Sequence, residues 1–157
     1  MSAKKAIFIG CGTVAVMGFM LIAILAAVFI YVSQDVQDVS ISITSPLDVE
    51  VGETFEMIIN IKNEREQKAL MVSAIDISDT YLAGFVIIST DPTPESTMHI
   101  PFDNSLSHAF ETSVPAGATA EFAFTLRAEE AGIFRGDVDL CEGSRFTTTT
   151  AQTVVND

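Results

Sequence analysis

The sequence predicts a mainly β protein in which one N-terminal transmembrane helix precedes an antiparallel β-sandwich. Residues 7–32 contain no charged side chain, whereas the rest of the chain repeatedly alternates apolar with polar residues. Glycine and proline residues separate these alternating stretches, and no helical periodicity follows residue 32. Alternation with a period of two is the pattern of a half-buried strand. Sheets with one apolar face bury that face against each other, which gives a sandwich.

The apolar segment predicts a cytoplasmic N-terminus over residues 1–5 and a membrane helix over residues 6–32. A helix over the charge-free residues reaches about 39 Å, enough for a hydrocarbon core of about 30 Å. Lys4 and Lys5 precede it, and the first charges after it are acidic. The positive-inside rule therefore places the C-terminal part outside the cytoplasm, in a periplasm or at the cell surface. A cleaved signal peptide would have a shorter apolar region of about 7–15 residues.

Small residues along this helix indicate a surface for close helix packing. Such residues let two membrane helices approach each other, and they are Cys11, Ala15, Gly18, Ala23 and Ala27. The expected partners of the helix are the lipid bilayer and another membrane protein or a second copy of the chain. The simpler alternative is that alanine and glycine are common in membrane helices.

Composition limits the partners of the displayed part. The chain has a formal charge of −13. Without Lys4 and Lys5, six basic residues face 21 acidic ones, so the part after the helix carries −15. That charge repels nucleic acid and anionic lipid. It keeps a surface soluble and could also attract a basic protein surface.

The two cysteines cannot form a disulfide within one molecule in this topology. Cys11 belongs to the membrane segment and Cys141 to the displayed part. Cys141 is then either a free thiol or an intermolecular cross-link, and the sequence leaves both open.

A short polar neck over residues 33–38 leads into one domain over residues 39–157, for which the pattern predicts seven to nine strands. Pro46 interrupts the first alternation, which predicts that this strand lies at a sheet edge or bends there. Ser78 predicts the cap of a single helical turn, and the apolar run 85–88 predicts a strand covered on both faces. The predicted strands cover residues 39–44, 47–51, 55–62, 70–77, 85–88, 108–111, 120–127, 134–141 and 146–155.

The size and strand count suit an immunoglobulin-like sandwich. The chain has no tryptophan and no disulfide to span the sheets, so it is not an antibody-type domain. The stretches SPLDVEVGETFEMIINIKN (45–63) and VPAGATAEFAFTLRAEEAGIFRGDVDL (114–140) are similar to bacterial and archaeal immunoglobulin-like modules of the CARDB type. That resemblance implies a role in adhesion, in stalks or in complex assembly.

The sequence shows no catalytic or cofactor-binding motif. His99 and His108 have no motif around them, and there is no Gly-x-Ser-x-Gly elbow or phosphate-binding loop. We therefore expect no enzyme activity and no cofactor. Asp137, Asp139 and Glu142 are weak candidates for calcium ligands, because carboxylates close together on one strand could converge. The ordinary alternative is a solvated acidic face.

These observations predict a non-enzymatic, single-pass membrane protein whose domain binds an extracytoplasmic protein surface, as an accessory subunit of a membrane or cell-surface complex. The alternative is a pilin- or archaellin-like filament subunit, since Lys4-Lys5-Ala6 faintly resembles a processing site. The helix lacks the early acidic residue of pilins, and Phe8 fits that site poorly.

Overall fold

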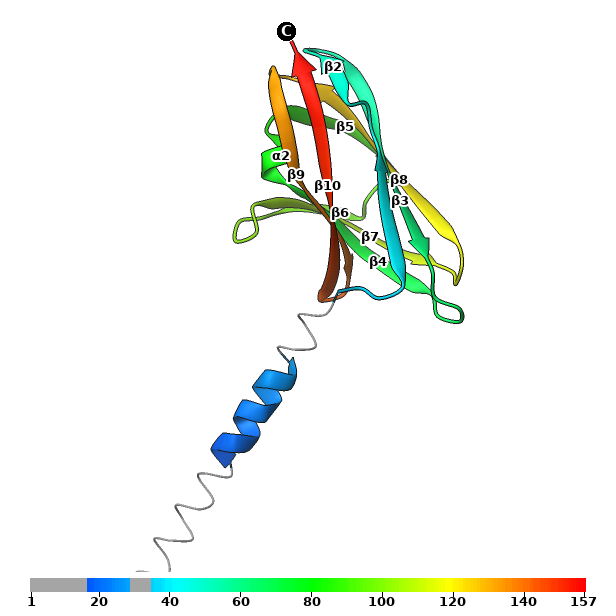
Figure 1. Cartoon of the computed structure of the whole chain (residues 1–157), viewed down its shortest axis with the longest axis vertical. Helices are drawn as coiled ribbons and strands as arrows, with labels where there is room; N and C mark the ends of the chain where they lie inside the picture. The colour runs from blue at the N-terminus through cyan, green and yellow to red at the C-terminus, as the bar shows by residue number, and fades with distance from the viewer. Residues whose placement is uncertain (1–16, 29–34) are drawn as a thin grey trace, which may run out of the picture. The chain divides into compact units, whose positions relative to one another are not determined.

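The computed structural model describes residues 17–28 and 35–157 of the chain (Figure 1). Residues 17–28 are helical with exposed side chains and include Gly18, Ala23 and Ala27. Within the described ranges, no helix is long and apolar enough to cross a membrane. Cys11, Ala15 and the remainder of the predicted membrane segment lie outside the described residues. A membrane-spanning helix is therefore not shown.

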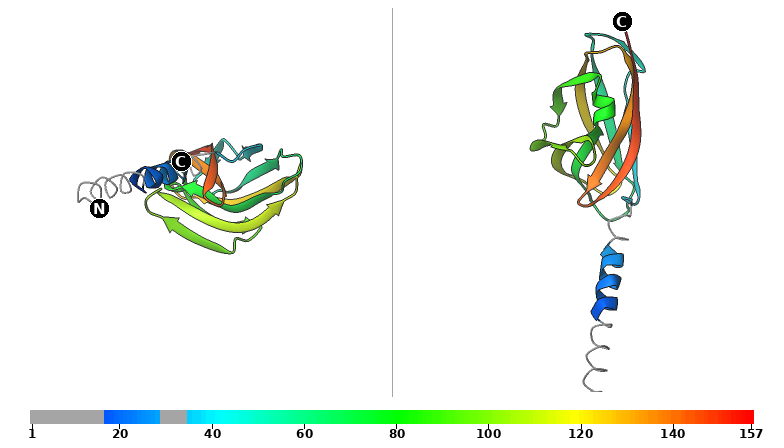
Figure 2. Two further views of the ribbon diagram at one scale, coloured as in Figure 1. Left: turned by 90° about the horizontal axis from the view of Figure 1, so that it is seen from below. Right: turned by 90° about the vertical axis from the view of Figure 1, so that its left-hand side faces the viewer.

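The β-rich unit contains two sheets that face each other (Figures 1 and 2). One has four antiparallel strands, in the order β1 (Val39–Thr44), β3 (Thr54–Asn63), β8 (Thr119–Ala128) and β5 (Phe85–Asp91). The other has six, in the order β2 (Asp48–Glu50), β10 (Arg145–Asn156), β9 (Gly132–Glu142), β4 (Leu70–Ser78), β7 (Ser105–Val114) and β6 (Ser96–Ile100). The predicted two-sheet sandwich is confirmed, with ten strands in the described part of the chain rather than seven to nine.

The core lies between the two sheets and is made by the faces that the alternation predicts. The four-stranded sheet buries Phe55, Met57, Ile59, Ile61, Phe122, Phe124 and Leu126. The six-stranded sheet buries Leu70, Val72, Ile75, Ile77, Val138 and Leu140. Fully burying one such side chain stabilises the fold by about 1.5–3 kcal/mol. The compact unit begins at Asp35, and Val36 of the expected neck is already buried in this core.

Pro46 marks the point where the chain passes from one sheet to the other. In the part of the chain that the structure describes, β1 pairs only with β3, at the edge of the four-stranded sheet. After Pro46, β2 pairs in parallel with the end of β10. The predicted edge position of β1 is therefore confirmed.

The predicted helical turn is present as α2 (Asp79–Leu82), and it packs closely on β9. The Ser78 side chain accepts a hydrogen bond from the Thr80 backbone N–H, as an N-cap does. Gly136 of β9 lies beneath this turn. A Cβ on Gly136 would lie 2.6 Å from Ser78 Oγ and 2.8 Å from the Tyr81 backbone nitrogen. Only glycine allows this approach without a shift of the turn.

In the middle of the domain, one prediction is wrong and one strand was not predicted. β5 is not covered on both faces, because it lies at a sheet edge with Val86 and Ile88 largely exposed. A continuous apolar run does not reveal which of its faces meets the core. β6 is a strand that the sequence did not predict, since serine, threonine and histidine residues give it no clear alternation.

Candidate binding site

Glu142, one of the three predicted calcium ligands, forms a buried ion pair with Arg65. Arg65 Nη1 and Nη2 donate to Glu142 Oε1 and Oε2 at 2.7 and 2.8 Å, and Arg145 also donates to Oε2. The side chains of Arg65 and Glu142 keep only 9% and 11% of their accessible surface. The Arg65 hydrogen bonds lower the pKa of Glu142. Both carboxylate oxygens are therefore occupied by guanidinium groups.

In the structure, the carboxylates of Asp137 and Asp139 do not converge with that of Glu142. Each carboxylate accepts a hydrogen bond from a hydroxyl of β10, Asp137 from Thr150 and Asp139 from Thr148. Among residues 17–28 and 35–157, no group of three or more His, Cys, Asp or Glu side chains could hold a metal ion. The physical reason is the odd spacing of Asp139 and Glu142, which sends their side chains to opposite faces of the strand.

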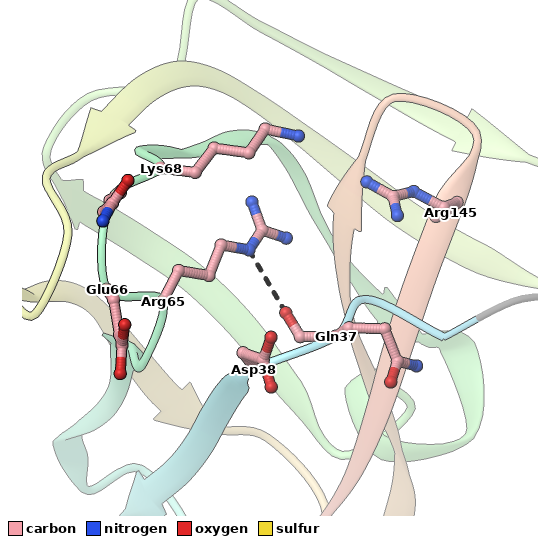
Figure 3. A pocket seen from close by; sticks show the side chains of 7 residues that line it. Gln37, Asp38, Arg65, Glu66, Lys68 and Arg145 are labelled. Atoms are coloured by element: carbon pink, nitrogen blue, oxygen red, sulfur yellow. Dashed lines mark hydrogen bonds between the residues drawn. The ribbon is translucent and has the colours of Figure 1, made fainter.

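A shallow polar pocket of about 390 Å³ lies where the chain enters the domain (Figure 3). Arg65 Nε donates to the Gln37 carbonyl at 3.2 Å, which ties the start of the domain to the loop after β3. Lys68 and Arg145 face the same hollow (Figure 3). Asp38 and Glu66 also line the pocket. The pocket lining comes from residues 37–38, residues 65–68 and Arg145. This arrangement is well suited to fixing the β9–β10 hairpin.

A second cavity, of about 250 Å³, opens on the outer face of the six-stranded sheet. We call it the acidic cavity. Its polar lining is Asp76, Asp103, Asp139 and Cys141, and its apolar lining is Ile100, Phe102 and Phe146. Three of these side chains come from the hairpin between β6 and β7, which projects from the body of the sandwich (Figures 1 and 2). The cavity therefore joins a charged sheet face to an apolar hairpin tip.

The floor of the acidic cavity is poorly solvated. Burial is the largest cause that raises the pKa of Asp139, and nearby Asp103, Asp76 and Asp137 raise it further against the Thr148 hydrogen bond. Burial also raises the pKa of the Cys141 thiol, with a further contribution from Asp76. Cys141 Sγ donates to Asp76 Oδ2 at 3.5 Å. The thiol is therefore protonated, free and half-buried.

The two histidines occupy unrelated environments. His108 is buried, with its ring edge-on to Phe124 at a centroid distance of 5.1 Å, and burial lowers its pKa. His99 is on the surface, where Nε2 lies 2.7 Å from Asp79 Oδ2. His108 contributes to the core through its ring contact with Phe124.

Sequence reasoning found only part of the acidic cavity. It singled out Asp139 but gave no role to Asp76, which lies inside the predicted strand 70–77, and it had no pattern for Phe102 or Asp103. The available signal was a lone aspartate between the buried Ile75 and Ile77. Such a residue usually faces solvent, so the signal alone does not indicate burial.

Comparison with known proteins identifies no family, since neither a family model nor a curated protein matches the sequence. The cupredoxin domain of amoB from Nitrosocaldus yellowstonii is 13% identical over 78% of this chain and 90% of that chain, with a TM-score of 0.50. A CARDB domain from Pyrococcus furiosus, solved in complex with di-metal ions, is 13% identical over 79% of this chain and 94% of that chain, with a TM-score of 0.46. An exo-β-N-acetylglucosaminidase from Vibrio harveyi matches 76% of this chain at 13% identity, over 18% of its own length, with a TM-score of 0.42. The likeness to the cupredoxin domain shows a shared fold, a two-sheet β-sandwich.

Proposed function

We propose that this protein is a non-enzymatic binding or assembly module, held to a membrane by residues 6–32 and displayed outside the cytoplasm. In this role it is an accessory subunit of a membrane or cell-surface complex. The charge-free apolar segment behind Lys4 and Lys5 supports the anchor and its orientation. The strong negative charge supports a protein partner rather than nucleic acid.

The observation that carries this proposal is the apolar surface around the acidic cavity. Phe102 keeps 91% of its accessible surface, Met98 65% and Phe146 49%. Ile100 and Pro101 connect Met98 with Phe102 along one hollow of the hairpin. Exposed apolar patches with polar neighbours are typical of protein interaction sites. Aromatic residues such as these dominate the binding energy of many interfaces.

Native sizing tests the module directly. The full-length chain is tagged, expressed in its source organism and extracted in mild detergent. The mass of the native species that contains it is then measured. We expect a complex larger than the monomer, and we expect the Phe102→Ser, Phe146→Ser double variant to lose it. Ile133→Ser is the matched control, because Ile133 lies on the outward side of β9, outside the cavity lining, and is 73% exposed. A monomeric wild type, or equal losses in the double variant and the control, contradicts the proposal.

Topology and processing require separate measurements. We expect alkaline carbonate to leave the chain in the membrane fraction, and external protease to digest the domain in cells stripped of any outer barrier. Release by carbonate contradicts the anchor. Intact-mass analysis separates the filament alternative, because a processed subunit would lack about its first six residues.

A further inference from the structure

The acidic cavity holds two carboxylates that the sheet forces together. Asp76 of β4 and Asp139 of β9 are direct cross-strand partners on the outer face. Like charges directly opposite each other in a sheet are destabilising. Asp103 of the β6–β7 hairpin lines the same cavity and adds a third carboxylate.

The carboxylate of Asp76 is poorly compensated by the protein itself. Asp76 keeps only 8% of its accessible surface, and its Oδ1 is buried without a hydrogen-bond partner among the described residues. Within residues 17–28 and 35–157, its Oδ2 accepts a hydrogen bond only from the Cys141 thiol, a weak donor. Among the described residues, the ion pairs involve other acids, namely Glu142, Asp79 and Glu129. A buried carboxylate without a partner is costly, so this site favours a cation.

The apolar lining of the cavity indicates which kind of cationic group it could bind. Ile100, Phe102 and Phe146 line it together with the carboxylates, so an apolar stem with a charged end complements the lining. A lysine side chain has this form: its methylene stem packs on apolar surface and its ammonium lies beyond. Aromatic rings also attract an ammonium group directly.

Other cations fit the cavity less well. Calcium takes six to eight oxygens, and no group of three acidic, histidine or cysteine side chains in the described ranges could hold a metal ion. The arginine guanidinium is a planar fork that matches the two oxygens of one carboxylate. Here the oxygens come from Asp76 and Asp139 on different strands. An ammonium has three donors that can point to separate acceptors.

We propose that the acidic cavity is a receptor for a lysine side chain of a partner protein, with Asp76 and Asp139 binding the ammonium and Phe102 and Phe146 enclosing the stem. The inference rests on the proposed function and names the residue type that the module recognises. The negative charge of the domain attracts a basic partner surface and complements such a lysine.

The first test uses the ¹⁵N-labelled full-length chain in detergent micelles. The probe is N-acetyl-lysine methylamide, with the norleucine analogue, the arginine analogue and calcium chloride as parallel arms. We expect saturable chemical-shift changes at the residues lining the cavity with the lysine probe, and at least tenfold weaker binding of the norleucine and arginine analogues. No saturable change, equal binding of either analogue, or the same changes with calcium alone overturns the proposal.

The carboxylate variants separate this site from general charge attraction. Asp139→Asn removes one charge from the cavity floor, and we expect at least tenfold weaker binding of the lysine probe. Asp137→Asn removes one charge two residues away on the same strand, and we expect binding to be unchanged. Equal effects of the two variants overturn the proposal. Neither change should unfold the domain, since Asp139→Asn relieves repulsion and Asp137 is exposed.

A carboxyl–amine cross-linker applied to native membranes then identifies the source of the lysine. We expect the carbodiimide EDC to join Asp103 or Asp139 to a lysine of another protein, and Asp137→Asn to leave the product unchanged. A cross-link only to Lys62 or Lys68 of a second copy, or none at these aspartates, contradicts the proposal. If a native complex persists and depends on Phe102 while lysine binding fails, the proposed function stands and this inference alone falls.

Discussion

At the scale of single residues, the acidic cavity affects the reactivity of the Cys141 thiol. Its thiol is half-buried and donates to Asp76. Burial first, and the neighbouring carboxylate second, raise the pKa of this thiol. Only the thiolate is a good nucleophile. We therefore expect the Cys141 thiol to react slowly in the folded chain.

We predict that Cys141 of the folded full-length chain reacts with N-ethylmaleimide at pH 8 at least roughly tenfold more slowly than in urea. Asp76→Asn should speed the reaction of the folded chain several-fold, because it removes a negative charge beside the sulfur. Peptide mapping by mass spectrometry separates Cys141 from Cys11. Asp137→Asn is the control and should leave the rate unchanged; equal rates in folded and unfolded chain would refute the account of this thiol.

His108 gives a second prediction, on stability against pH. Burial lowers its pKa below the ordinary 6.5, although the Asp76 carboxylate acts in the opposite direction. Below about pH 6.5 the unfolded chain binds a proton at this histidine and the folded chain does not. Stability from this residue is therefore full above pH 6.5 and is lost as the pH falls toward the lowered pKa.

The measurement is the free energy of unfolding in urea between pH 8 and pH 5. We expect wild type to lose stability over this range and His108→Phe, which keeps a ring against Phe124, to lose less. Asp139 has the opposite effect on stability. Its pKa is raised in the folded chain, so as the pH falls the folded chain binds a proton at Asp139 before the unfolded chain does. This proton uptake stabilises the folded chain as the pH falls. The comparison is therefore repeated in Asp139→Asn. Parallel curves for wild type and His108→Phe would show that His108 is not the group responsible.

At the scale of elements, the ion pair between Arg65 and Glu142 joins the loop after β3 to the β9–β10 hairpin. Glu142→Gln leaves two guanidinium groups without their carboxylate, and we expect a loss of about 2–3 kcal/mol in the free energy of unfolding. The matched control is Glu129→Gln, which breaks the half-exposed pair with Arg127 and should cost less than about 1 kcal/mol. Urea unfolding at pH 7 measures both; similar losses in the two variants would count against a structural role for the Glu142 pair.

The contact of α2 with β9 gives a prediction about packing. Gly136→Ala places a methyl group against the backbone of the turn, which cannot rotate away. We expect a loss of about 1–3 kcal/mol in the free energy of unfolding, as overpacking usually gives. Adding Ser78→Ala should not restore stability, because the Tyr81 backbone nitrogen remains at 2.8 Å. Wild-type stability of Gly136→Ala in urea would mean that the turn is not packed this closely.

Elements differ in how well the sequence predicts them. The strands over residues 55–62 and 120–127 were predicted well because each buries one face and exposes the other. β5 was misjudged because an apolar run looks the same in the centre and at the edge of a sheet. The acidic cavity could not be predicted, since the register of β4 against β9 decides that Asp76 meets Asp139. The position of Phe102 depends on a hairpin without any periodic pattern.

At the scale of the whole molecule, the domain joins a negative charge, an exposed apolar hairpin and a buried acidic cavity on one sheet face. Arg65 and Arg145, two of its few cations, bind Glu142 internally. The uncompensated charge of the cavity therefore remains available to a partner. Together with the charge-free segment 6–32, these features are the basis of the proposal of an anchored module that recognises a protein.

The most direct test of this account is photo-cross-linking in intact membranes of the source organism. A benzophenone amino acid replaces Phe102 in one variant and the exposed Ile133 in the other, and the products are separated by size. The account predicts a discrete adduct of larger mass from position 102 and none from position 133. Equal adducts from both positions, or no adduct from position 102, would contradict it.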